Sequence, residues 1–287
     1  MLNVTDIVVG SLRALSFVVV IQAAGAAIFL SLFESELVGT SRFIRRLTFL
    51  AAVGGCLLVI SQHLAEPARM TGSFSGIWDS SLQAILLASN AGTSRAVRIT
   101  GLVVIAWSAV SNHPLSNQLG MVGAVLTIGS FMLMGHTAAH SLRWMLAVLL
   151  LVHLLVSAFW FGSLMSFWFT STREQIATNA AIVQRFSAIA GWLVPLVLLA
   201  GIGMAFTLIR DLATLTSPYG LLILVKFFAF GGLLALAAWN KWSLGPAIAQ
   251  GSLEAQITFR RVVGAEWVTI AALLVLTSVM TGLFGPD

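Results

Sequence analysis

Charged residues are what this sequence has least of. Asp, Glu, Lys and Arg make up only 9% of its 287 residues, whereas 59% are hydrophobic and the mean hydropathy is +0.99. Soluble domains carry about a quarter charged residues, and no soluble fold of this length buries so much apolar surface. The composition therefore excludes a soluble protein and indicates one whose solvent is the lipid bilayer.

Cysteine and basic clusters are nearly absent as well. The single cysteine, Cys56, excludes an internal disulfide framework and any cysteine-based zinc site, so we expect it to pack between helices. The net charge is +5, but the cations are scattered between apolar segments without interleaved aromatics, so we expect no nucleic-acid partner. The chain also lacks a nucleotide-binding motif for ATP-driven transport, and we expect no enzymatic activity.

Long apolar runs are what the sequence has instead. A transmembrane helix needs about 20 mostly apolar residues. The runs are long and continuous and lack the alternation of strands, so we predict an all-α polytopic transmembrane helical bundle, a single integral membrane domain over residues 1–287. The eight expected spanning helices are Val8–Phe33, Phe43–Leu64, Arg95–Ser111, Gln118–Gly135, Leu142–Phe169, Ala181–Ile209, Tyr219–Trp242 and Ile257–Leu283.

The longest stretch between predicted spans is residues 65–94. It contains Pro67 and the short apolar piece SLQAILLAS at 81–89. We predict an extramembrane loop with a helix lying at the membrane interface, and a lid over a site is the alternative. Eight spans put both termini on one side of the membrane, and the distribution of Lys and Arg among the loops favours the outside.

Ionisable residues inside such a chain need a reason, because each costs about 3 kcal/mol or more in hydrocarbon. The stretch FMLMGHTAAH, residues 131–140, carries Met132 and Met134 followed by His136 and His140. Residues four apart share a helix face, so Met132, His136 and His140 can form one stripe. Thioether and imidazole together suit Cu(I), and imidazole alone suits Cu(II) or Zn, although methionines also serve as core filling.

The predicted topology brings four of the five histidines to the outer half of the bundle. His63 ends the second helix on that side, His136 and His140 end the fourth, and His153 lies about three turns into the fifth. The remaining histidine, His113, falls at the opposite end and is expected in a solvated loop. The candidate metal ligands are therefore His63, His136, His140, His153, Met132 and Met134.

Two charges lie deep in the late helices. Lys226 is about two turns into the seventh predicted helix, and Glu266 is two to three turns into the eighth. They could pair directly or bridge through Asn240 and water. One interpretation is a buried ion pair that fixes helix register, and the other is a gate or a carboxylate ligand on an ion path.

A set of spaced residues runs through the last four predicted helices. It consists of a histidine seven residues before a tryptophan, the triplet RFS, YG with a lysine seven residues after the tyrosine, an asparagine before a basic residue, and a buried glutamate. The segments are HLLVSAFWFGSL (153–164), RFSAIAGWLVPLVLLAGIG (185–203), YGLLILVKFFAFGGLLALAAWNKW (219–242) and RRVVGAEWVTIAALLVLTS (260–278). With these segments the chain resembles the copper resistance D (CopD) family of bacterial inner-membrane proteins. Lys241 stands where the family pattern leads us to expect arginine, so a bidentate contact there is lost.

The resemblance implies a copper-binding protein of the bacterial inner membrane that moves copper ions, Cu(I) or Cu(II), with uptake into the cytoplasm favoured. It also implies a separate soluble, periplasmic, CopC-like copper-binding partner, and we expect both termini to be periplasmic. Two alternatives remain open. One is a haem b electron carrier, with His63 and either His136 or His153 as paired axial ligands. The other is a copper sensor or assembly factor that transports nothing.

Overall fold

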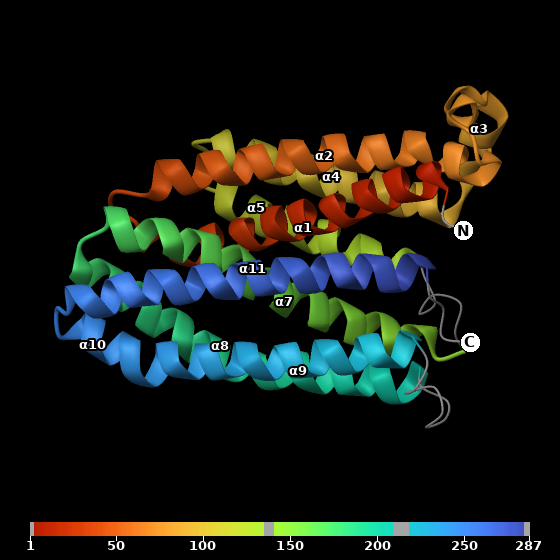
Figure 1. The fold of residues 1–287 in the computed structure, drawn as a ribbon. Coiled ribbons are helices and arrows are strands. Elements are labelled where there is room, and N and C mark those ends of the chain that lie inside the picture. Colours follow the sequence, from red (N-terminus) through yellow and green to blue (C-terminus); the bar gives the residue numbers. More distant parts are fainter. Residues whose placement is uncertain (1–2, 135–140, 209–217, 284–287) are drawn as a thin grey trace.

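The chain folds into long helices that run along one common axis (Figure 1). The computed structural model describes residues 3–134, 141–208 and 218–283, and every regular element in those ranges is helical. Eight of the helices are long and apolar enough to cross a bilayer. The predicted all-α polytopic bundle with eight spans is therefore confirmed, and the protein is a multi-pass membrane protein.

The spanning helices agree with the predicted runs in number and order but differ at their ends. They are α1 (Val4–Phe33), α2 (Ser41–Thr71), α4 (Asn90–Val110), α5 (Ser116–Gly129), α7 (Arg143–Arg173), α8 (Ile176–Leu208), α9 (Pro218–Trp239) and α11 (Leu253–Leu283). Shorter elements join or extend them: η1 (Glu34–Glu36), η2 (Phe74–Trp78), α3 (Ser80–Ala88), η3 (Ser130–Leu133), the π-helical η5 (Asn240–Leu244) and α10 (Gly245–Ala249).

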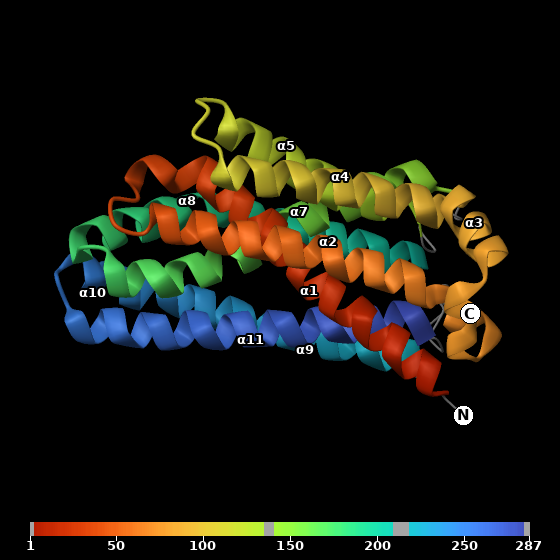
Figure 2. The same cartoon turned by 90° about the horizontal axis from the view of Figure 1, so that it is seen from above.

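The predicted loop over residues 65–94 is mostly helical, which corrects the sequence-based boundaries. Helix α2 continues to Thr71 with Pro67 in its last turns, and α4 already begins at Asn90. The piece SLQAILLAS forms α3, which the Asp79 carboxylate caps by accepting from the backbone N–H groups of Ser81 and Leu82. Figure 2 shows α3 at the end of the bundle.

Small residues let the central helices approach closely. A side-chain carbon added to Gly25 of α1 would lie 1.8 Å from the backbone oxygen of Ala158 in α7, and one added to Gly162 would lie 2.2 Å from the Gly25 carbonyl carbon. Such glycine contacts are a common way for membrane helices to pack. Cys56, partly buried in α2, packs against the same core, as the sequence predicted.

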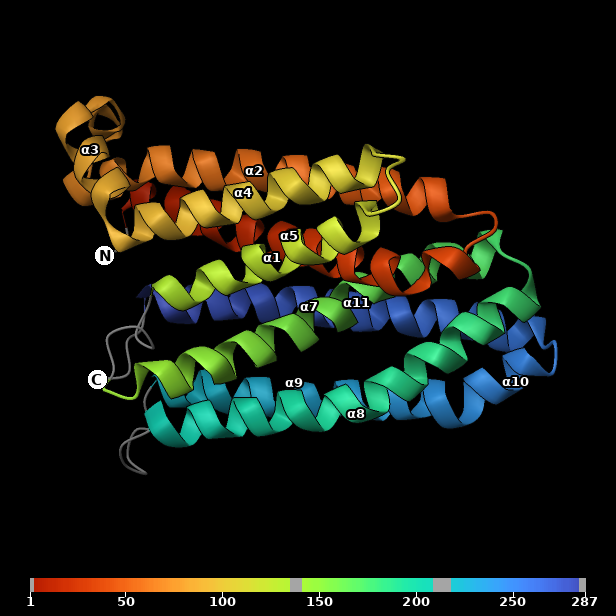
Figure 3. The same ribbon diagram turned by 180° about the vertical axis from the view of Figure 1, so that it is seen from behind.

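The helices form a centre and two sides. Figures 1 and 3 show α2 and α4 along one side, α8 and α9 along the other, and α1, α7 and α11 between them. The outer helices expose large apolar side chains, including Trp192 at 83% and Phe206 at 82%, which suit contact with lipid.

The two ends of the bundle differ in what they carry. Helix α1 begins and α11 ends at the same end, where α3 also lies; we call it the terminal face (Figure 1). The opposite face carries η1, α10 and the turn between α7 and α8. The first and the last helix of the described chain therefore meet the same side of the membrane, as eight spans require.

Candidate metal path

The sequence-predicted ligands do not form one cluster in the described part of the chain. Met132 lies in η3 and Met134 follows it, both partly buried near the terminal face. His136 and His140 lie outside the described residues. Within residues 3–134, 141–208 and 218–283, no three His, Cys, Asp or Glu side chains lie close enough together to hold a metal ion.

His63 is arranged as a hydrogen-bond donor instead of a metal ligand. Its Nδ1 lies 2.9 Å from Nη1 of Arg95 on α4. A guanidinium only donates, so Nδ1 accepts, and the neutral ring carries its hydrogen on Nε2. The Nε2 atom is buried and has no hydrogen-bond partner among the described residues. Both nitrogens are therefore without a free lone pair, and the neighbouring guanidinium opposes a cation.

His153 has the opposite arrangement. Its Nδ1 lies 3.1 Å from the backbone oxygen of Val197 on α8. A carbonyl only accepts, so Nδ1 carries the hydrogen and Nε2 keeps its lone pair. Gly201 makes room for the ring, since a side-chain carbon there would lie 3.4 Å from Cε1 of His153. A backbone carbonyl that fixes one nitrogen is the usual support of a metal-binding histidine.

Lys226 belongs to the surroundings of His153. It lies on α9, eight residues after Pro218, and it is close enough to the His153 ring to interact with it electrostatically. Both residues are about 12–15 Å from the helix ends at the terminal face. No carboxylate in the described part of the chain pairs with Lys226.

The direct Lys226–Glu266 ion pair, one of the two interpretations of these charges, is therefore not formed. Among the described residues the Asn240 side chain bonds to Glu266 and not to Lys226. Asn240 stands 22 residues after Pro218, so it lies about 20 Å farther along the α9 axis than Lys226. The two charges sit at different depths because the helices that carry them run antiparallel.

Glu266 is held by neutral donors from two other helical segments. It lies on α11 and is 1% exposed. Its Oε1 accepts from Nδ2 of Asn240 at 2.7 Å, and its Oε2 accepts from Nε1 of Trp160 on α7 at 3.4 Å. Asn240 opens the π-helical turn, a deformation frequent at functional sites, and its Oδ1 is buried with no hydrogen-bond partner among the described residues.

Trp160 and Gln22 take part in the surroundings of Glu266 through hydrogen bonds that the sequence did not predict. Trp160 follows His153 by two turns on the same face of α7, about 10 Å along the axis, so one helix face leads from the imidazole toward Glu266. Gln22 of α1 accepts from Nε1 of Trp267 at 2.9 Å, beside Glu266 in the chain. The seven-residue spacing between His153 and Trp160 was visible in the sequence, but the hydrogen-bond partners of Trp160 and Gln22 were not.

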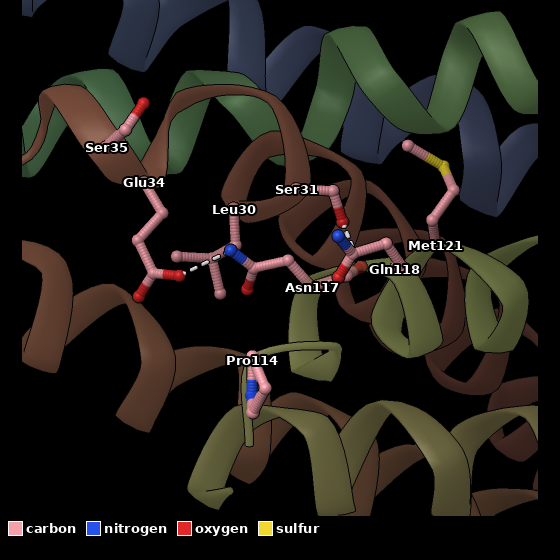
Figure 4. A pocket seen from close by; sticks show the side chains of 8 residues that line it. All are labelled: Leu30, Ser31, Glu34, Ser35, Pro114, Asn117, Gln118 and Met121. Atoms are coloured by element: carbon pink, nitrogen blue, oxygen red, sulfur yellow. Dashed lines mark hydrogen bonds between the residues drawn. The ribbon is translucent and has the colours of Figure 1, made fainter. Parts of the chain in front are cut away.

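A cavity of about 470 Å³ opens at the opposite face (Figure 4). Glu34 on its wall forms an ion pair with Arg45 and accepts from Nδ2 of Asn117 at 2.6 Å. His113 lines the neighbouring cavity, and its Nδ1 accepts from the backbone N–H of Leu115 at 3.2 Å. These groups are already satisfied, so they offer no free ligand to a cation. The larger cavity is lined by Leu30, Ser31, Glu34, Ser35, Pro114, Asn117, Gln118 and Met121.

Comparison with known proteins reaches the C-terminal helices. No curated protein and no solved structure matches the chain. Residues 180–280 match the family model described as Copper resistance protein D. The matched region contains Val197, Lys226, Asn240 and Glu266, which are the partners of the candidate path on α8, α9 and α11. Over this region the resemblance to the copper resistance protein D family that the sequence predicted is confirmed.

Proposed function

We propose that this protein transports copper ions across the bacterial inner membrane, with uptake into the cytoplasm as the favoured direction. The observation that carries the proposal is that the region matching the copper resistance family includes a buried carboxyl group and the helix that orients His153. A membrane seldom retains such groups unless they serve a path or a partner.

The proposed path begins at the terminal face, which we assign to the periplasm. Met132 and Met134 supply soft ligands there, His136 and His140 are the imidazole ligands that the sequence predicts to join them, and a soluble CopC-like carrier delivers copper to this set. The ion then passes to Nε2 of His153, the one histidine nitrogen that the described contacts leave with an oriented lone pair.

Two charged residues regulate the proposed path beyond the entrance. Lys226 acts on the His153 ring and opposes a cation there, so it serves as a gate. Glu266 lies deeper, with no cation as partner in the described part of the chain, so it attracts the ion onward, with Asn240 holding its carboxyl group in place.

The other two functions receive less support. A haem bound between two histidines needs two free imidazole nitrogens, and both nitrogens of His63 lack a free lone pair. A Soret band in the purified protein would nevertheless establish the haem carrier. A copper sensor or assembly factor differs from a transporter in moving no ions.

Copper flux into proteoliposomes tests the proposal. The wild-type chain is expected to move copper, and Glu266→Gln is expected to move it more slowly, because the amide keeps the bond to Asn240 but carries no charge. Arg46→Gln, an exposed change near the start of α2, serves as the control and should match wild type. Absence of flux from wild type under either gradient, with copper still bound, would leave the sensor.

A further inference from the structure

Four arginines gather near the terminal face around a single carboxylate. We call Arg13 of α1, Arg69 of α2, and Arg95 and Arg98 of α4 the arginine cluster. Arg13 is close enough to Arg69, Arg95 and Glu66 to interact with them electrostatically, and Arg98 interacts in the same way with Arg95 and Arg13. Four cations and one anion leave a formal charge of +4 − 1 = +3.

Arg98 is the most deeply buried cation of the cluster and has only neutral partners. It is 5% exposed. Its Nε donates to Oγ of Ser130 at 2.9 Å, its Nη2 donates to Oγ of Ser94 at 3.2 Å, and its guanidinium lies 3.7 Å from the centre of the Phe131 ring. A guanidinium stays charged in proteins, so this charge is buried without a counter-ion among the described residues.

The one carboxylate of the cluster is already shared. Oε1 of Glu66 lies 2.8 Å from Nη2 of Arg69, and Oε2 of Glu66 lies 3.5 Å from Nη2 of Arg95. Arg13 donates to Oγ1 of Thr281 at 2.9 Å and has no carboxylate partner in the described chain. The segment 135–140, which follows η3, contributes no acidic residue.

His63 adds an unused donor to the same place. Because its Nδ1 accepts from Arg95, its Nε2 carries the hydrogen, and that buried group has no acceptor in the part of the chain that the structure describes. A buried N–H without an acceptor and a buried guanidinium without a counter-ion lack the same thing, which is an anion with several acceptor oxygens.

We propose that the arginine cluster binds a phosphate group. The planar forks of arginines match phosphate oxygens, and a charge of +3 suits an anion and repels a metal cation. Arg95, Arg98, Arg13 and His63 lie about 8–14 Å from the helix ends at the terminal face. Helix α2, with 31 residues, is about 46 Å long against about 30 Å of hydrocarbon, so this depth is close to the lipid headgroups.

The phosphate can come from an anionic lipid or from inorganic phosphate, and titration of the purified full chain separates the two sources. Inorganic phosphate and short-chain phosphatidylglycerol are titrated separately, with phosphatidylcholine of equal chain length as the reference, by calorimetry and by the shift in melting temperature. Saturable binding of phosphatidylglycerol alone identifies the lipid, and saturable binding of inorganic phosphate identifies the free ion. Phosphatidylcholine is expected to bind more weakly than the anion that binds.

Variants of the cluster decide whether the binding occurs there. Arg98→Gln is expected to lower the affinity for the anion by at least about tenfold. Arg98→Lys keeps the charge but loses the planar fork, so it is expected to lower the affinity by less. Arg46→Gln removes one exposed charge elsewhere and should bind as wild type. If Arg98→Gln does not fold, Arg13→Gln at a partly exposed member repeats the test. Equal affinity in wild type and cluster variants, or no saturable binding of either anion, would overturn the proposal, whatever the outcome for copper flux.

Discussion

At the scale of single residues, the two described membrane histidines show how a hydrogen-bond partner determines what an imidazole can do. His63 faces a guanidinium and must accept from it, whereas His153 faces a carbonyl and must donate to it. The same side chain therefore becomes a donor in one half of the bundle and a potential ligand in the other.

His153→Ala is expected to lower copper affinity by at least about tenfold without unfolding the bundle, because it removes a nitrogen ligand but no helix contact of α1 with α7. Titration against a competing chelator, with a thermal melt of the same sample, measures both. His136→Ala is expected to behave alike. His113→Ala, at the opposite face, is the control and should bind copper as wild type. Unchanged stoichiometry and affinity in His153→Ala would remove this residue from the path.

Lys226→Met is expected to strengthen copper binding, because it removes the charge that opposes a cation near His153 while keeping a side chain of similar length. Lys226→Arg keeps the charge and should leave the affinity near that of wild type. The chelator titration measures both variants. A lower affinity in Lys226→Met would show that the lysine helps to hold the ion, not to exclude it.

Sequence alone located the deep residues better than it paired them. The depth of His153, Lys226 and Glu266 followed from counting along apolar runs, which is how the spans are defined. A direct Lys226–Glu266 ion pair was one of the interpretations left open, and it is not formed, because the register of antiparallel helices cannot be read from one chain. The bonds of Glu266 to Trp160 and Asn240 depend on α7 and on a π-helical turn, and hydropathy carries no signal for either.

At the scale of elements, the contact between α1 and α7 depends on the absence of side chains. Gly25→Val is expected to destabilise the protein by about 3 kcal/mol or more, because the added carbons meet the backbone of Ala158 and overpacking of this kind forces helices apart. Gly264→Val is the matched control, since the first side-chain carbon added there meets nothing within 4 Å. Thermal melts in one detergent compare them, and equal melting temperatures for the two variants would contradict the close approach.

The short helix α3 depends on its cap. The Ser81 hydroxyl and the backbone N–H of Leu82 bond to the Asp79 carboxylate and lower its pKa, with the hydroxyl as the larger cause. A lowered pKa in the folded state means that the cap contributes stability above the ordinary pKa of about 4 and loses it as the pH falls further. The protection of the α3 amides from hydrogen exchange, measured against the intrinsic exchange rate at each pH, is expected to fall at low pH. Asp79→Ala should show the same reduced protection at neutral pH. Identical protection in the variant would contradict the cap.

Element boundaries near α3 also show the limit of prediction from the sequence. The end of the apolar run predicted an end to the second helix near Leu64, yet α2 continues to Thr71, because a proline in its last turns disturbs few backbone bonds. The apolar piece that follows was predicted as a helix and is one.

At the scale of the whole molecule, the bundle divides its polar groups between two halves. The arginine cluster occupies the half built from α1, α2 and α4, and the candidate copper path follows α7, α8, α9 and α11. Arg98 of the cluster contacts Ser130 and Phe131, beside the proposed entrance at Met132, whereas the deeper residues of the path lie in the other half. The match to the copper resistance family covers the helices of the second half that face α7.

The position of bound copper tests the proposed path most directly. A crystal of the full chain soaked with copper, with anomalous diffraction recorded at the copper edge, is expected to show a peak about 2 Å from Nε2 of His153. Copper bound instead beside the Glu34–Arg45 pair at the opposite face, or against His63 within the arginine cluster, would contradict the path.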